Sequence, residues 1–417
     1  MELKKYKLGE ILDVTRGASL RGEFYAPEGE YIRLTCGNFD YQNNCFKENR
    51  SKDNLYYTGD FRPEFLMEKG DIITPLTEQA IGLLGSTAII PESGKYIQSQ
   101  DVAKIICKEN LLDKDFAFYL ISSNIVKQQL SAAAQQTKIR HTSPDKIKDC
   151  IVWIPELTEQ KRIGKLLRNL DLKIELNRSI NQNLEAMAKQ LYDYWFVQFD
   201  FPDENGKPYR SSGGEMVWND KLKRKIPKGW DVVKLDDSFQ VVTKKVKKEE
   251  IQHLLYAPIE VLPKKQMSFY NTAPIESAVS GLCKFDKGNI LLSNRRVYFH
   301  KVCIAPFNGV TRDTVIILRA LNKETFGFDY QVINSEHFIS YATKFSYGSE
   351  QPVLSWQDAK NYNYVKPKNK IAEKYSACIA PLIEKNLEAQ MELRELVKQR
   401  EELLPLLMNG QVSVNFN

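Results

Sequence analysis

Two stretches of the chain carry side chains that suit the reading of nucleic-acid bases. Each follows a Lys-Gly turn and a short aliphatic run, at residues 69–73 in one case and 287–291 in the other. The side chains in these stretches that would face DNA are Thr77, Gln79, Asn294, Arg295, Arg296, Tyr298, His300 and Lys301. Amides pair well with adenine edges, and arginines with guanine edges or phosphates. The pattern predicts two DNA-facing loops; a chance surface arrangement is the alternative.

Cations outside these loops are candidates for phosphate contacts. They are Arg16, Arg140, Lys244, Lys245 and Arg312. Residues 219–366 hold 23 Lys and Arg against 15 Asp and Glu, a surplus of 8, whereas the whole chain carries a net charge of +6. Neutralising phosphates releases counterions, so this surplus favours a polyanion as partner. A solvated lysine-rich surface is the alternative.

No combination of residues in the sequence suits catalysis. We find neither a P-loop nor the Asn-Pro-Pro-Tyr type loop that a methyltransferase needs for a target amine. The pattern nearest to a nuclease site is Pro144-Asp145 followed by Glu159 and Lys161, but these last two residues open a predicted helix. The four histidines lie far apart, without acidic or cysteine neighbours at a metal-ligand spacing. We therefore expect a chain without a catalytic site, a bound cofactor or a metal.

The elements that would position the two loops occur twice along the chain. The segment DVAKIICK from Asp101 matches DTVIILR from Asp313, at an offset of 212 residues. Pro155 and Pro367 share that offset, and each closes a short extended segment. The first part of each half reads as β-strands, and the hydrophobic period lengthens after the proline. The sequence predicts an α+β fold with an internal repeat.

Hydrophobic residues take a heptad spacing after each proline, which predicts a pair of helices that form a coiled coil. The predicted seam residues are Leu170, Asn177, Ile180, Leu184, Met187 and Leu191 in the first helix, and Ile379, Asn386, Leu393, Leu396 and Leu403 in the second. Asn177 and Asn386 would set the register from inside the seam, unless they face solvent. We expect a break near the start of each helix, at Asp171 and at Pro381.

Length and composition limit the class of protein. A chain of 417 residues is too long for one ordinary core, and its 42% hydrophobic content is typical of folded domains. The seven cysteines are scattered without paired spacing, so we expect reduced thiols and a cytoplasmic location. No apolar run approaches the roughly 20 residues that cross a bilayer, so no membrane association is expected.

The helical segments resemble the specificity subunits of type I restriction-modification enzymes. The resemblance is carried by VWIPELTEQKRI from Val152, by LLRNLDLKIELNRSINQNLEAMAKQLYDYWFVQFD from Leu166 and by LVKQREELLPLLMNGQVSV from Leu396. It extends over nearly the whole chain and is weak inside the two globular halves. The second junction, KPKNKIAEKY, departs from the family's pattern.

This resemblance implies two β-rich target-recognition domains, separated by two long helices packed as an antiparallel coiled coil in a pseudo-twofold repeat. The implied parts are a first recognition domain (1–155), a central spacer helix (156–199), a connector (200–229), a second recognition domain (230–367) and a C-terminal spacer helix (368–417). Each domain would read one half of a bipartite site in double-stranded DNA, and the helices would set the spacer between the halves.

The resemblance also implies partners. Two methyltransferase subunits would dock on the helices, and restriction subunits with translocase and nuclease activity would join them. ATP, S-adenosylmethionine and Mg would be bound by those subunits and not by this chain. The alternative is a scaffold whose helices join proteins and whose globular halves bind peptides or sugars; such a protein would select no DNA sequence.

Overall fold

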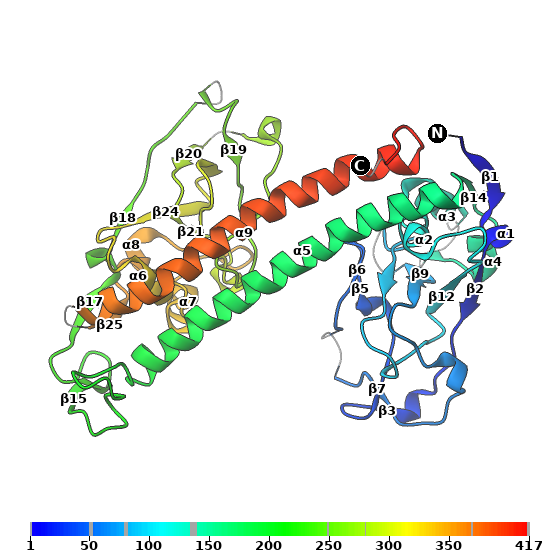
Figure 1. The fold of residues 1–417 in the computed structure, drawn as a ribbon. Helices are drawn as coiled ribbons and strands as arrows, with labels where there is room; N and C mark the ends of the chain where they lie inside the picture. The colour runs from blue at the N-terminus through cyan, green and yellow to red at the C-terminus, as the bar shows by residue number, and fades with distance from the viewer. Residues whose placement is uncertain are drawn as a thin grey trace. The chain divides into compact units, whose positions relative to one another are not determined.

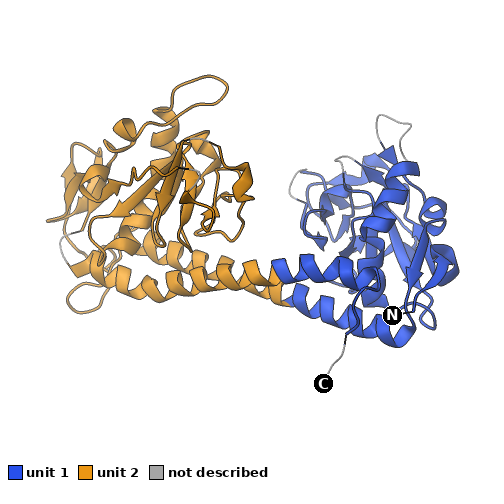
Figure 2. Ribbon diagram, turned by 90° about the horizontal axis from the view of Figure 1, so that it is seen from above, with its two compact units in different colours: residues 1–172, 398–417 blue, residues 173–397 orange. Residues whose placement is uncertain are grey.

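The computed structural model describes residues 2–49, 53–78, 82–133, 140–247, 250–279, 281–367 and 370–414. The chain divides into two compact units: residues 1–172 and 398–417 form unit 1, and residues 173–397 form unit 2 (Figure 2). The long helices α5 (Leu157–Tyr192) and α9 (Lys370–Met408) each contribute to both units (Figure 1). Strands and helices are both abundant, so the predicted α+β class is confirmed.

Unit 1 is built on two four-stranded sheets. The strand order of the first is β10 (Ala88–Ile89), β8 (Ile72–Pro75), β12 (Val102–Cys107) and β2 (Leu12–Arg16). The order of the second is β11 (Tyr96–Ile97), β4 (Tyr31–Arg33), β7 (Tyr56–Tyr57) and β3 (Tyr25–Ala26). Successive side chains of a strand point to opposite faces, and both Ile72 and Ile73 are buried, in different core clusters. The aliphatic run after the Lys-Gly turn is therefore a central strand with a core on either side.

Short helices and two-stranded pairs also belong to unit 1. The helices are α1 (Leu8–Ile11), α2 (Lys114–Ile121), α3 (Asn124–Ala133) and α4 (Pro144–Lys148), and β1 (Lys4–Lys7) pairs with β14 (Ile151–Ile154). The side chain of Ser143 caps α4 by accepting a hydrogen bond from the Lys146 amide. Leu407 and Met408, at the end of α9, are buried in the core of unit 1. This unit therefore needs both ends of the chain.

Unit 2 has the same kinds of element. The main sheet has the order β18 (Phe239–Val241), β24 (Val315–Ala320), β21 (Ile290–Ser293) and β22 (Val302–Ile304). The smaller sheet has the order β19 (Leu255–Tyr256), β23 (Gly309–Arg312) and β20 (Leu282–Phe285), and β17 (Asp231–Lys234) pairs with β25 (Asn363–Lys366). Its helices are α6 (Phe326–Ile333), α7 (Glu336–Lys344) and α8 (Trp356–Ala359). A hairpin of β15 (Met216–Asn219) and β16 (Arg224–Pro227) lies in the predicted connector.

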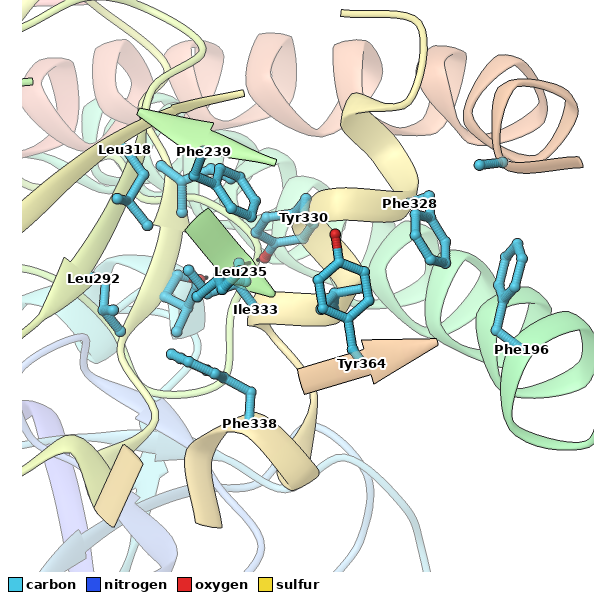
Figure 3. Packing of buried hydrophobic residues seen from close by; sticks show 14 of the residues in the cluster. Phe196, Leu235, Phe239, Leu292, Leu318, Phe328, Tyr330, Ile333, Phe338 and Tyr364 are labelled. Atoms are coloured by element: carbon cyan, nitrogen blue, oxygen red, sulfur yellow. Dashed lines mark hydrogen bonds between the residues drawn. The ribbon is translucent and has the colours of Figure 1, made fainter. Parts of the chain in front are cut away.

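The core of unit 2 joins the main sheet to α6. Phe239, Leu292 and Leu318 come from three neighbouring strands of that sheet. They lie on the side toward Tyr330 and Ile333 of α6 (Figure 3), and all five side chains are buried. An aliphatic sheet face covered by a helix buries apolar surface on both elements, which stabilises the unit.

The predicted internal repeat is confirmed in the topology. β10-β8-β12-β2 of unit 1 corresponds strand by strand to β22-β21-β24-β18 of unit 2. The second sheet described for each unit contains one parallel strand pair. This pair is β11 with β4 in unit 1 and β19 with β23 in unit 2. Helices α2, α3 and α4 begin at Lys114, Asn124 and Pro144, and α6, α7 and α8 begin 212 residues later. Each half therefore repeats one arrangement of strands and helices.

Part of the predicted seam is wrong. Within unit 2, α5 and α9 run antiparallel, since Ala188 accepts a hydrogen bond from Tyr375 and Glu185 accepts one from Asn386. Met187 lies outside the seam, with 54% of its surface exposed, and Ala188 lies inside it. Successive buried positions of a coiled-coil seam are separated alternately by three and four residues. The sequence spacing alone does not show whether the step after Leu184 is three residues, to Met187, or four, to Ala188.

The other predicted seam residues are partly or fully buried. Asn177, Ile379, Asn386, Leu393 and Leu396 are buried, whereas Leu170, Ile180, Leu184, Leu191 and Leu403 are half-buried. The asparagines do not face solvent, and they do not bond to each other. The Nδ2 of Asn177 donates to the Lys173 carbonyl, and that of Asn386 donates to Glu185.

The predicted helix breaks are also wrong, because α5 and α9 are continuous through Asp171 and Pro381. Asp171 is buried in unit 1, where it accepts hydrogen bonds from Tyr119 at 2.6 Å and Arg400 at 3.2 Å. Pro381 lies on the exposed side of α9, while Ile379 and Ile383 on either side of it are buried. Tertiary packing on the opposite face thus holds the helix across the proline.

Candidate nucleic-acid interface

The loop that follows β21 in unit 2 is held by its own polar side chains. Asn294 Nδ2 donates to the Asp313 carbonyl at 2.9 Å, and Arg296 Nη2 donates to the Glu350 carbonyl at 3.2 Å. The Arg296 amide donates to the Pro352 carbonyl at 2.9 Å. Among the described residues, no partner reaches the buried Asn294 Oδ1 or Arg296 Nε. Asn294 and Arg296 therefore shape the loop, and each keeps one polar atom without a protein partner.

The same loop continues into a short 3-10 turn, η8 (Val297–Phe299). Val297 is buried, whereas Tyr298 has 47% of its surface exposed. His300 closes the turn and is itself buried; its Nε2 lies 2.9 Å from Asn334 Oδ1. Lys301 Nζ donates to the Ile259 carbonyl at 2.7 Å, and burial lowers the pKa of this ammonium. Lys301 thus supports the loop from the inside, while Tyr298 points outward.

In unit 1 the equivalent loop forms a two-stranded pair. β9 (Thr77–Glu78) pairs with β13 (Arg140–His141). Thr77 Oγ1 donates to Asp101 Oδ1 at 3.3 Å and lies 3.3 Å from His141 Nδ1. Gln79 lies outside the described residues. The structure therefore joins Thr77 to His141 and Asp101, two residues that sequence reasoning did not propose as site residues.

Arg140 is committed to an acidic partner. Its Nη1 donates to Glu78 Oε2 at 3.4 Å and to Ser131 Oγ at 3.2 Å. The Glu78 side chain is only 5% exposed, and the Gly82 amide donates to its other carboxylate oxygen at 2.8 Å. A cation at 34% exposure beside a buried carboxylate is fixed in position. The sequence analysis did not propose Glu78 as a site residue. Its place directly after Thr77 is the one sequence feature that points to it.

The two loops occupy equivalent places in the repeat. The Thr142 amide donates to the Leu76 carbonyl at 2.9 Å, and the Leu354 amide donates to the Asn294 carbonyl at 2.8 Å. Thr142 and Leu354 are themselves 212 residues apart. The position that holds Glu78 in unit 1 is therefore held by Arg296 in unit 2. One architectural position carries different polar side chains in the two units.

The remaining predicted cations lie on other segments of the two units. Arg16 Nε donates to the Gln100 carbonyl at 2.8 Å. Lys244 and Lys245 are exposed, and the backbone of Lys245 forms a bridge with Cys283. Arg312, at the end of β23, is half-buried, and no described residue bonds to its buried Nε.

The residues nearest to a nuclease pattern have a structural role. Glu159 is buried in unit 1, where it accepts a hydrogen bond from the Val414 amide at 2.9 Å and pairs with Arg162 at 3.4 Å. Within the described ranges, no group of three or more His, Cys, Asp or Glu is placed to hold a metal ion. In the same part of the chain, no helix combines the length and the apolar character of a membrane span.

Comparison with known proteins shows which family the chain resembles. Residues 1–186 match the model for the type I restriction modification DNA specificity domain. The specificity subunit of the type I restriction enzyme MjaIX from Methanocaldococcus jannaschii is 24% identical over 339 residues, which are 76% of this chain and 73% of that subunit. This chain is similar to the type I specificity subunits.

A second relative and a solved structure show the same likeness. The HindI specificity subunit of Haemophilus influenzae is 28% identical over 200 residues, which are 47% of this chain and 41% of that subunit. The crystal structure of the type I S subunit from M. genitalium aligns with all of this chain and 97% of its own chain, with a TM-score of 0.63 at 17% identity. At that identity the likeness establishes the fold alone. The family model ends at residue 186, inside α5.

Proposed function

We propose that this chain is the specificity subunit, the non-catalytic DNA-reading component, of a type I restriction-modification complex. In this proposal, domain 1–155 and domain 230–367 each read one half of a bipartite site in double-stranded DNA. The observation that carries it is the pair of equivalent loops, one after β8 and one after β21. Equivalent scaffolds with different side chains suit the reading of two different half-sites.

The chemistry of the two loops supports different preferences. The unit 2 loop holds Arg295, whose guanidinium group matches guanine edges, beside Asn294 and Arg296, which shape the loop. In unit 1 the corresponding loop offers Thr77 and His141 beside the Arg140–Glu78 ion pair. Among the described residues, the unit 1 loop has fewer free cations than the unit 2 loop, so hydroxyl and imidazole groups would carry more of the contact.

The long helices are proposed to set the spacer and to dock two methyltransferase subunits. Leu176 and Met187 of α5 have 59% and 54% of their surface exposed. In this proposal, these two apolar side chains contact the methyltransferase subunits. Restriction subunits with translocase and nuclease activity would complete the complex. ATP, S-adenosylmethionine and Mg would be bound by these partner subunits in the cytoplasm.

Selection from a random duplex library tests the proposal. The specificity subunit is purified with its methyltransferase partner, and the bound duplexes are sequenced. The wild-type complex should enrich a bipartite motif. Arg295→Ala should change or erase one half of that motif and leave the other half, because one good bidentate contact discriminates by about 1 to 3 kcal/mol.

Arg319→Ala is the matched control. Arg319 lies in the same unit and forms an exposed ion pair with Asp286 at 2.9 Å, so its loss should leave both halves unchanged. Equal loss of both halves in Arg295→Ala would indicate phosphate contact or misfolding instead of base reading. If the wild-type complex enriches no motif, the proposal is refuted, and a peptide- or sugar-binding scaffold becomes the better reading.

A further inference from the structure

We propose that Tyr298 is an aromatic wedge that stacks between two adjacent base pairs in the half-site read by unit 2. This inference rests on the proposed function, since it requires DNA to lie against the η8 loop. It goes beyond edge reading, because a wedge recognises how easily a base step opens and not which hydrogen-bonding groups it presents.

Tyr298 is presented at the apex of a very short turn. Val297, immediately before it, is 1% exposed and belongs to the main core of unit 2, whereas Tyr298 is 47% exposed. Phe299, immediately after it, is half-buried and packs edge-on against the Tyr298 ring, with the ring centroids 4.8 Å apart. A buried anchor on one side and an aromatic support on the other hold the exposed ring in one place.

The backbone of this turn is held in an unfavourable conformation. Arg296, before the turn, and His300, after it, have left-handed φ angles of 47° and 53°. Lys265 has a φ of 55°, and its amide donates to the His300 carbonyl at 2.8 Å. Three of the six non-glycine residues with positive φ in the described part of the chain therefore meet here. Such residues persist only where surrounding contacts enforce them, and they concentrate at functional sites.

Those enforcing contacts come from several elements of unit 2. The Arg296 amide bonds to Pro352, and His300 Nε2 lies within 3.0 Å of both the carbonyl and the side-chain oxygen of Asn334. Lys265 Nζ donates to Glu336 at the start of α7 at 2.8 Å. An exposed aromatic ring that needs no rearrangement on binding loses little conformational entropy when it stacks.

The charges around the ring suit DNA. Lys264 Nζ lies 4.0 Å from the centroid of the Phe299 ring, and Lys264 is itself exposed. Arg295 and Lys265 are in the same loop cluster. A base step that is opened by a ring leaves its phosphates beside the wedge, where cations neutralise them. Exposed aromatic rings also form contacts between proteins. Loss of the methyltransferase partner in Tyr298→Ala would indicate that role.

The test uses the complex with its methyltransferase partner and the duplex selected by the wild-type protein. The fluorescent base 2-aminopurine replaces an adenine at successive steps of the unit 2 half-site, because its emission rises when it unstacks. Wild type and Tyr298→Phe should raise the emission at one step. Tyr298→Ala should abolish that rise and weaken binding on the order of 10-fold to 100-fold in fluorescence anisotropy. Trp218→Ala is the control, since Trp218 is a 59% exposed aromatic residue of β15 in the same unit.

The outcomes separate this inference from the proposed function. If no complex, including wild type, binds a specific duplex, the proposed function fails. If wild type binds specifically and Tyr298→Ala shows the same emission profile and affinity, the wedge is refuted while the proposed function stands. If Tyr298→Ala instead loses the methyltransferase partner and keeps the emission rise, Tyr298 is a protein contact and the wedge is likewise refuted.

Discussion

Removing the charge of Glu185 should stabilise unit 2 at neutral and alkaline pH. Burial raises the pKa of the Glu185 carboxyl from 4.5 to about 7, although its oxygen accepts hydrogen bonds from the Met267 amide at 2.9 Å and from Asn386 Nδ2 at 3.3 Å. Glu185→Gln keeps an oxygen that accepts both hydrogen bonds and has no charge to bury. The perturbation therefore isolates the cost of a buried carboxylate.

The sign follows from proton linkage. Below the unfolded pKa of 4.5 the carboxyl is protonated in both states and contributes no pH dependence. Between 4.5 and about 7 the unfolded chain releases the proton and the folded chain keeps it, so the stability of the wild type falls as the pH rises. This pKa difference between the unfolded and folded states corresponds to roughly 3 kcal/mol of unfolding free energy. Partial hydration of the half-buried Glu185 side chain reduces that contribution to about 1 to 3 kcal/mol.

Urea denaturation at pH 5 and pH 8 measures the effect. Glu185→Gln should be more stable than wild type at pH 8 by about 1 to 3 kcal/mol, with a smaller advantage at pH 5. Glu392→Gln, at an exposed position of α9 in the same unit, should follow the wild-type profile. The reasoning is refuted if Glu185→Gln lowers the stability at pH 8, because the carboxylate would then be stabilising as an ion. Identical pH profiles for Glu185→Gln and wild type would refute it too.

Two further changes test unit 1 and the repeat. Arg400→Leu should destabilise unit 1 by about 3 to 5 kcal/mol in denaturation, because it leaves the Asp171 carboxylate, at 10% exposure, without its ion-pair partner. The double variant Asp171→Asn with Arg400→Leu should recover stability. If it does not, loss of the ion pair is not the cause. Ser143→Ala and Ser355→Ala should each cost about 1 kcal/mol, because each hydroxyl caps a helix at the same place in the repeat. A loss confined to one of the two would show that the caps are not energetically equivalent.

The sequence by itself determined the features that depend on local pattern. These features are the two Lys-Gly turns, the matched strands and the change to a helical period. Each depends on residues close in the chain, so the sequence alone predicts it. The heptad spacing predicted two long helices, and burial of Asn177 and Asn386 agrees with their place in the seam. Residues 166–200 carried the family resemblance for the same reason, since a helix that packs along its whole length constrains successive positions.

Only the tertiary structure decided which side chains meet. Met187 and Ala188 are neighbours in sequence, and packing against the rest of unit 2 put the smaller one inside the seam. Thr77 and His141 are 64 residues apart, so no local pattern could place them 3.3 Å from each other.

The same holds for the shape of the unit 2 loop. The left-handed backbone at Arg296 and His300 is disfavoured for these residue types, and contacts from Pro352 and Asn334 impose it. Local propensity would have assigned both residues to other conformations. The surroundings prevail because many distant contacts, each weak, act on the same two residues at once, and that sum is a property of the folded unit and not of any segment.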